Sequence, residues 1–275
     1  MHDASEPASA PAAAYARIDE RTFHSTALTR GPWNPDHQHA GPPTAIVCGA
    51  VEKVAQAHGL THISRLTANL IRPVPIGNLC VEVVTDYVGR NAGHFSAHLM
   101  AGSKEVGRFT ALAQRPTHVE LPESLPGHPL PAMAVLPDRS VEAHFPFKKK
   151  QLGYGHLVQT RAAAGRMFAG PCSIWFRLLY PLLEGEEPSP YQRVAVAADS
   201  GNGISAILDF QKFSFVNFDL TVNLLRPPEG EWICLEAKTY ASGMGAGLAE
   251  SALYDVKGFI GRSTQNLSIR RRTQE

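Results

Sequence analysis

The chain has 275 residues, enough for two domains of ordinary size or for one large domain. Hydrophobic residues make up 44% and charged residues 19%, which excludes a disordered, highly charged chain and allows a large buried core. Lysine and arginine number 26 against 25 aspartates and glutamates, so the net charge of +1 gives no electrostatic reason to bind nucleic acid or a membrane surface. A small molecule is therefore the expected partner.

The first 14 residues contain acids and prolines but no basic start followed by an apolar stretch, which predicts a disordered tail and not a signal peptide. No window reaches the roughly 18 consecutive apolar residues of a membrane span. The four cysteines lie 32 or more positions apart without a C-x-x-C pair, which favours reduced, buried thiols over a zinc site or a disulfide framework. These features predict a cytoplasmic protein without a membrane segment.

The first half of the chain predicts a strand, a helix and four further strands, in that order. Apolar residues at helical spacing indicate the helix, and Gly41-Pro42-Pro43 forms a proline-rich helix start. Alternation of side chains indicates the strands, most clearly from Leu79 to Val88. The expected ranges are a strand near 16–28, a helix over 44–57, and strands over 66–72, 79–88, 94–101 and 106–114.

The second half predicts the same order of elements. An apolar strand segment over 170–183 precedes a helix over 190–199, with the sequence PYQRVAVAAD. Strands follow from position 220, one of them over 232–240, and Asp255 to Gly258 is expected to form the last turn.

The two halves also repeat each other at a constant offset of 154 positions. Leu66 to Pro73 (LTANLIRP) and Leu220 to Pro227 (LTVNLLRP) share six of eight residues, and 16 of the 45 positions from 66 to 110 are identical in the second half. This match indicates two copies of one structural unit. Seven prolines between 116 and 146 predict an extended connector that lets the two sheets pair edge to edge.

A strand, a long helix and four antiparallel strands are the order of a hotdog unit, in which the sheet wraps around one helix. The chain is therefore predicted to be an α+β protein with a double hotdog fold, made of two tandem β-α-β-β-β-β units. The expected organisation is a disordered tail over 1–14, an N-terminal hotdog over 15–115, a proline-rich connector over 116–146 and a C-terminal hotdog over 147–275.

Several familiar catalytic and binding motifs are missing from the sequence. It contains no G-x-S-x-G nucleophile elbow and no G-x-x-x-x-G-K-[ST] phosphate loop. Gly243 to Gly247 is glycine-rich, but strands are expected on both sides of it, which favours a sheet bend or a hairpin. The closely spaced histidines point apart or lack a third ligand, so neither a metal nor a cofactor is expected.

Segments of the second half resemble a known family. They are Pro188 to Gly203, Phe215 to Trp232, and Gly247-Leu-Ala followed by Gly261-Arg-Ser-Thr-Gln265. In these segments the chain resembles thioesterase-like, double-hotdog proteins related to type II acyl-CoA thioesterases, and the resemblance extends over about positions 15 to 271.

The resemblance implies hydrolysis of acyl-CoA thioesters, a reaction of lipid metabolism, by a water molecule that three side chains orient. Carried over position by position, these are Asp199 at the end of the second helix, Asn217 on the next strand and Gln265 on the last strand. The prototype bacterial enzymes have threonine where this chain has asparagine. The acid is expected to act as general base or to orient the water, while the amides hold the water and the carbonyl oxygen. Without the resemblance, Asp199 is equally well explained as a cap for the loop that follows it.

The first copy carries a different fragment, His39-Ala-Gly41-Pro-Pro, directly before its helix. It resembles the His-Gly-Gly signature of single-hotdog thioesterases, so His39 and Gly41 are candidate substrate-binding residues, with backbone N–H groups polarising the thioester carbonyl. The acid sought nine residues after the histidine is replaced by Cys48, and Ala111 stands at the repeat position of Gln265. One copy is thus stripped of these polar groups while the other keeps them, which predicts one working site per chain. His39 is explained equally well as a residue that holds the turn before the helix.

Other functions remain open. A non-catalytic acyl-CoA-binding protein would retain the same polar residues for folding. A hotdog hydratase acting on enoyl-CoA would need an Asp–His pair, and the second copy has no histidine after His156 to supply one. The expected partner is acyl-CoA, and because hotdog sheets often associate further, a homo-oligomer is an alternative to a monomer.

Overall fold

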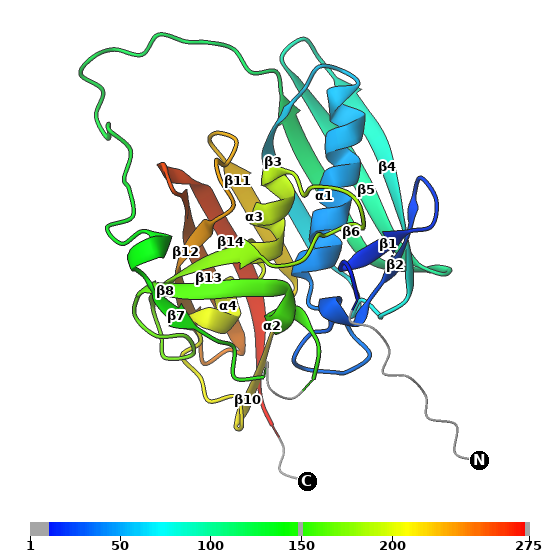
Figure 1. Ribbon diagram of the computed structural model, residues 1–275, viewed down its shortest axis with the longest axis vertical. Coiled ribbons are helices and arrows are strands. Elements are labelled where there is room, and N and C mark those ends of the chain that lie inside the picture. The colour runs from blue at the N-terminus through cyan, green and yellow to red at the C-terminus, as the bar shows by residue number, and fades with distance from the viewer. Residues whose placement is uncertain (1–10, 148–150, 273–275) are drawn as a thin grey trace.

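The computed structural model describes residues 11–147 and 151–272. In the first half, a short hairpin and a 3-10 turn precede one long helix, and four strands follow it (Figure 1). The bounds are β1 (Tyr15–Arg17), β2 (Thr22–Ser25), η1 (Ala27–Thr29), α1 (Gly41–Gln56), β3 (His62–Leu70), β4 (Asn78–Val88), β5 (Ala92–Ala101) and β6 (Lys104–Gln114). The helix and the four strands after it agree with the elements that the sequence predicts.

The second half has the same order, with additional elements at its start and between its long helix and the strands that follow. A connector without helix or strand over 116–136 leads into it and arches over the outside of the molecule (Figure 1). The bounds are η2 (Pro137–Arg139), β7 (Val141–Ala143), α2 (Tyr154–Leu157), β8 (Val158–Ala164), β9 (Cys172–Leu178), α3 (Pro190–Ala198), α4 (Gly201–Ile204), β10 (Phe213–Asn217), β11 (Asp219–Leu224), β12 (Ile233–Ala241), β13 (Ala246–Asp255) and β14 (Gly258–Arg271). The strands β7 and β8 lie outside the elements predicted from the sequence.

The strands of the described residues form one sheet, and the two copies of the repeat join at its centre. The order is β1-β2-β4-β5-β6-β3-β11-β14-β13-β12-β9-β8-β7, and β10 pairs with β14 off this path. Where β3 pairs with β11, Thr67 lies opposite Thr221 and their hydroxyl oxygens are 3.2 Å apart. Because 221 − 67 = 154, repeat-related residues face each other, so a pseudo-twofold axis passes between these two strands. The expected edge-to-edge pairing of the two sheets is confirmed.

The helices α1 and α3 pack against each other inside the curve of the sheet (Figure 1). Ser189 caps α3: its hydroxyl accepts a hydrogen bond from the Gln192 N–H, and the Gln192 side chain accepts one from the Ser189 N–H. Close packing requires glycine at Gly41, because an added Cβ would lie 2.5 Å from the Val196 carbonyl oxygen. Contacts run from Gly41 beside Val196 to Glu52 beside Ser189, so the start of each helix lies next to the end of the other.

The main hydrophobic core lies between the two helices and the inner face of the sheet. Ile46 and Val51 of α1, Val194 of α3, and Phe95 and Leu235 of the sheet belong to one buried cluster. Burial of each such side chain is worth about 1.5–3 kcal/mol. Because side chains of both copies share this core, the two copies are expected to fold together.

Two expectations about the N-terminal segment need correction. Residues 1–10 of the expected tail lie outside the described residues, but Ala13 and Ala14 are buried, and the Ala14 N–H donates to the Pro181 carbonyl at 3.0 Å. The end of the expected tail is therefore packed against the second copy. The single opening strand expected near 16–28 is instead the pair of short strands β1 and β2, with a turn between them.

The glycine-rich segment, the cysteines and possible membrane or metal-binding features complete the description of the fold. Gly243 to Gly247 spans the turn between β12 and β13, so of the two predicted alternatives the hairpin is confirmed. All four cysteines are free; three are buried and Cys80 is partly buried. Over 11–147 and 151–272, no helix is long and apolar enough to cross a membrane, and no three histidine, cysteine or acidic side chains are grouped to hold a metal ion.

Candidate active site between the two copies

His39 and Asp199, one from each copy, are in contact where the two helices meet. His39 lies two residues before α1, and Asp199 is the C-cap of α3. The imidazole Nδ1 is 3.0 Å from Asp199 Oδ2 and 3.2 Å from the Gly41 nitrogen. One ring nitrogen cannot both donate and accept. We assign the Nδ1 proton to the contact with Asp199, because an ionised oxygen is the stronger hydrogen-bond acceptor.

The Asp199 carboxylate is buried and surrounded by hydrogen-bond donors. Asn217 Nδ2 donates to Oδ1 at 2.8 Å, and Gln265 Nε2 lies 3.4 Å from the same oxygen and 3.2 Å from the Asp199 backbone carbonyl. Burial alone would raise the pKa of Asp199, but the attraction and hydrogen bond of His39, the Asn217 amide and the Gly41 N–H together hold this pKa below its usual range. The carboxylate is therefore an ionised acceptor that fixes its neighbours.

The two amides predicted from the sequence both lie beside Asp199, but their surroundings differ. Gln265 is only 2% exposed, and its Oε1 accepts a hydrogen bond from the Asn202 N–H at 3.0 Å, so both ends of its amide are used within the protein. Asn217 is half-buried, and its Oδ1 has no hydrogen-bond partner in the described part of the chain. Of the two, only Asn217 offers an unused polar atom to a ligand.

Tyr154 supports the His39 ring from one side. The two rings are parallel within 4°, with their centroids 3.7 Å apart. The Tyr154 hydroxyl lies 2.9 Å from the Val196 carbonyl oxygen and 2.8 Å from Ser200 Oγ, so the tyrosine is itself fixed to the end of α3. The stacking sets the plane of the imidazole, and Asp199 sets its rotation. No motif in the sequence points to this tyrosine.

A cavity of about 360 Å³ opens beside this pair, between the two copies. Its polar lining includes His39, Asp199, Asn202 and Asn217. Its apolar lining includes Trp33, Leu70, Ile71, Pro73, Val74, Phe215, Val216 and Phe218. Several of these apolar side chains are solvent-exposed, so the mouth of the cavity is apolar as well. Such a cavity suits a ligand with an apolar body and a single polar group placed near His39.

The start of α1 offers a ligand fewer N–H groups than a typical helix start. Pro42 and Pro43 have none, the Thr44 N–H donates to the Ala40 carbonyl at 3.1 Å, and the Gly41 N–H is directed to His39 Nδ1 at 3.2 Å and to the Asp199 carboxylate beside it. The positive end of the helix dipole thus stabilises the carboxylate of the other copy.

The first copy is not as poor in polar groups as its sequence indicates. Cys48 stands nine residues after His39 and is buried. One helical turn later, however, Glu52 is also buried, and it accepts a hydrogen bond from the Ser189 hydroxyl at 2.6 Å. The first copy therefore keeps one buried acid, at a position other than the one that the His-Gly-Gly resemblance pointed to.

Two family models match this sequence, one in each half. Residues 29–114 match the acyl-CoA thioesterase N-terminal domain, and residues 137–269 match the acyl-CoA thioesterase C-terminal domain. No curated protein matches the sequence at a significant level.

Solved structures share the fold over nearly the whole chain. A protein from Thermobifida fusca, described as a candidate thioesterase II, has a TM-score of 0.70 at 15% identity, over 94% of this chain and 96% of its own. A hot dog protein of unknown function from Alicyclobacillus acidocaldarius has a TM-score of 0.67 at 18% identity, over 96% and 97% of the two chains. The CurJ dehydratase has a TM-score of 0.51 at 13% identity, over 92% of each chain, so proteins described by different reactions share this fold. Because a family model matches each half, the chain belongs to the acyl-CoA thioesterase family and has its double hotdog fold.

Proposed function

We propose that this protein hydrolyses acyl-CoA thioesters to the free acid and CoA at the cavity shared by its two copies. The observation that carries the proposal is the 3.0 Å contact of His39 with the buried Asp199 at the cavity wall. A histidine whose ring is oriented by a carboxylate is a common general base in acyl transfer. Such a reaction belongs to lipid metabolism, and four free cysteines suit a cytoplasmic protein.

In this mechanism His39 is the base and Asp199 orients it. When the ring is neutral and Nδ1 donates to Asp199, Nε2 carries the free lone pair. A water held by Nε2 and by the Asn217 carbonyl attacks the thioester carbon and gives its proton to Nε2. The proton then passes to the CoA sulfur as the C–S bond breaks. Asp199 is a weaker candidate for the base, because its pKa is lowered and its oxygens already accept several hydrogen bonds.

The negative charge that develops on the carbonyl oxygen needs a hydrogen-bond donor. Asn202 lines the cavity together with Asn217, and its backbone N–H is used by Gln265. Its side-chain amide has no partner among the residues that the structure describes. We assign this amide as the donor to the carbonyl oxygen. Gln265 is a positioning residue, because both ends of its amide are used within the protein.

The same pair also supports a second candidate, the hydration of an enoyl thioester. The absence of a histidine from the second copy argued against that reaction, but His39 of the first copy supplies one. A hydratase needs one group to donate a proton while another accepts one. Asp199 is a poor donor because its pKa lies below its usual range. Thioester hydrolysis is therefore the better supported reaction.

The test is a panel of acyl-CoAs of increasing chain length, in which a thiol-detecting dye measures the release of CoA. The panel includes an enoyl-CoA, whose absorbance reports hydration of its double bond. We expect CoA release that falls by about a hundredfold or more in Asp199→Asn, within the range for loss of acid–base catalysis. Binding of every acyl-CoA without release would identify a non-catalytic acyl-binding protein. Loss of enoyl absorbance without CoA release would identify a hydratase.

A further inference from the structure

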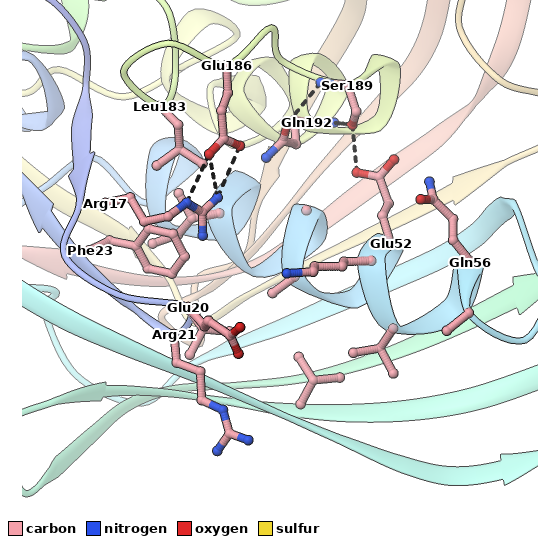
Figure 2. Close-up of a pocket in the computed structure, with 18 of the residues that line it drawn as sticks. Arg17, Glu20, Arg21, Phe23, Glu52, Gln56, Leu183, Glu186, Ser189 and Gln192 are labelled. Atoms are coloured by element: carbon pink, nitrogen blue, oxygen red, sulfur yellow. Dashed lines mark hydrogen bonds and ion pairs between the residues drawn. The ribbon is translucent and has the colours of Figure 1, made fainter.

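A second cavity, of about 580 Å³, lies at the other end of the helix pair (Figure 2). Figure 2 shows Arg17 and Phe23 of the β1–β2 hairpin on one side of it and Glu52 and Gln56 of α1 on the other. The start of α3, with Ser189, completes the lining. This cavity is separate from the one beside His39, and the proposed reaction does not use it.

The two cavities lie at opposite ends of the helix pair. At the first cavity, His39 lies just before α1 and contacts Asp199 at the end of α3. At the second, the cap of α3 is Ser189, which contacts an acid in the last turns of α1, Glu52, at 2.6 Å. Each acid contacts a residue just before the start of the other helix, but the two acids do not occupy equivalent positions in the repeat. Each end of the helix pair thus has a cavity with a buried acid in its wall.

Glu52 carries an unused hydrogen-bonding atom. The residue is 7% exposed, and its Oε2 accepts the hydrogen bond from Ser189. Within the described residues, no hydrogen bond reaches its other oxygen, Oε1. Burial, opposed by the Ser189 hydrogen bond and by Arg193, raises the pKa of Glu52 to about 7. Oε1 is not among the described buried polar atoms that lack a partner, so it is open to the cavity, where a polar group of a ligand can reach it.

The remaining lining combines an apolar wall with cationic side chains at the rim. The apolar residues include Phe23, Ile46, Val54, Val81 and Val83. The rim carries three cations and the exposed acid Glu20, and of the cations Arg17 is paired with Glu186 at 2.8 Å. Arg21 and Lys53 are exposed and form no ion pair within the described residues. An apolar wall under unpaired cations fits an anion that carries an apolar chain.

The groups assigned to hydrolysis at the first cavity are missing at the second. The repeat positions of Asn217 and Gln265 are 217 − 154 = 63 and 265 − 154 = 111. They are occupied by Ile63 and Ala111, both buried in the apolar core. Neither residue lines the second cavity, and within the described residues no histidine contacts Glu52, so the histidine–acid pair assigned to hydrolysis has no counterpart at this end.

We propose that the second cavity binds an acyl ligand, with its chain against the apolar wall, its carbonyl oxygen accepting a hydrogen bond from the protonated carboxyl group of Glu52, and its negative charge facing Arg21 and Lys53. A fatty acid and an acyl-CoA share this chemistry. The class of ligand rests on the proposed function, whereas the existence of the site rests on the cavity and the buried glutamate.

The test is equilibrium binding of two probes, dodecanoate and the non-hydrolysable thioether S-dodecyl-CoA. Ala50 lines the second cavity, so Ala50→Phe is expected to remove one binding equivalent per chain. Lys53→Glu, at an exposed position that tolerates substitution, is expected to weaken that equivalent about tenfold or more, a factor that corresponds to 1.4 kcal/mol. Matched controls are Ala241→Phe and Lys238→Glu, both at exposed positions of β12.

The proposal is supported if one binding equivalent of probe per chain is reduced in both cavity variants and retained in both controls. The probe that shows it identifies the ligand as a fatty acid or as an acyl-CoA. The proposal is overturned if neither probe binds. It is also overturned if the binding of both probes is unchanged in Lys53→Glu and in folded Ala50→Phe. Failure of the proposed function is distinguishable from failure of this proposal. In that case the wild-type protein releases no CoA, but it still binds the one equivalent of probe that Lys53→Glu weakens.

Discussion

Asp199 illustrates how one buried acid can be stabilised by residues from both copies of a duplicated fold. The first copy contributes His39 and the Gly41 N–H, and the second copy contributes Asn217 and Gln265. Each donor lowers the cost of the buried charge, so removing one donor leaves the carboxylate less well compensated.

Asn217→Ala tests the residue with two proposed contacts, one to Asp199 and one to the attacking water. We expect kcat to fall about tenfold to a hundredfold and the free energy of unfolding to fall by about 1–3 kcal/mol, because a buried acceptor loses its donor. Steady-state kinetics and urea denaturation would measure both effects. Asn223→Ala, at an exposed position of the neighbouring strand β11, should leave both unchanged. An unchanged kcat in Asn217→Ala would remove this residue from the mechanism.

Glu52 predicts a dependence of stability on pH. Its pKa is raised by burial from 4.5 to about 7 in the folded protein, so between these values the folded state binds more protons than the unfolded state. The stability therefore falls as pH rises through this window, by at most about 3 kcal/mol. Glu52→Gln keeps an acceptor for Ser189 without the charge, so it should be more stable than wild type above pH 7 and lose that advantage toward pH 4.5.

Thermal unfolding from pH 4.5 to 9 would follow this difference. Glu120→Gln, at an exposed position of the connector, is the matched control and should follow the wild type throughout. A difference between Glu52→Gln and wild type that does not change with pH would contradict the raised pKa.

At the level of elements, the packing of α1 on α3 sets the geometry of the site. A methyl group at Gly41 would lie 2.5 Å from the Val196 carbonyl oxygen, a backbone atom that cannot rotate away. Gly41→Ala is therefore expected to push the helices apart, at a cost of about 1–3 kcal/mol, and to reduce kcat by separating His39 from Asp199. Gly243→Ala, where an added Cβ meets nothing within 4 Å, is the matched control. Wild-type kcat in Gly41→Ala would show that this helix contact does not set the site.

Elements with strong local signals could be predicted from the sequence. Proline after Ser189, with Gln192 three residues later, marks the start of α3, and the capping box is present in the structure. The strand β8 (VQTRAAA) could not be predicted, because the alternation of its side chains covers only the first four residues and three alanines follow. Its neighbour β7 has only three residues, too few for a periodic signal.

The candidate site could be predicted only in part. The resemblance pointed to Asp199 and Gln265, which lie together, but the partner of His39 was sought nine residues along the same helix. The acid beside His39 is 199 − 39 = 160 positions away, in the other copy. That contact depends on how two helices pack, which a local sequence pattern does not encode.

At the scale of the whole molecule, the repeat correctly predicted how the halves join. The register that places Thr67 opposite Thr221 follows from the 154-residue offset, and the shared core then holds the halves together without help from the connector. We propose that the connector extends over 116–146, between an N-terminal hotdog from residue 15 and a C-terminal hotdog from residue 147.

Cutting the connector should therefore leave the molecule intact. A protease site inserted between residues 120 and 130, where there is no helix or strand, is expected to give two fragments that elute together on size exclusion and retain full kcat/KM. Wild-type protein treated with the same protease is the control. Fragments that separate, or a loss of activity on cleavage, would show that the connector itself holds the two copies together.

The central claim is that one histidine and one acid, from different copies, act as a unit in thioester hydrolysis. A double-mutant cycle tests it most directly, with kcat/KM for the best acyl-CoA measured in wild type, His39→Ala, Asp199→Ala and the double variant. We predict that each single change costs about a hundredfold or more, and that the double variant is only a few-fold worse than the poorer single variant. Losses that multiply, or either single variant at the wild-type rate, would contradict the account.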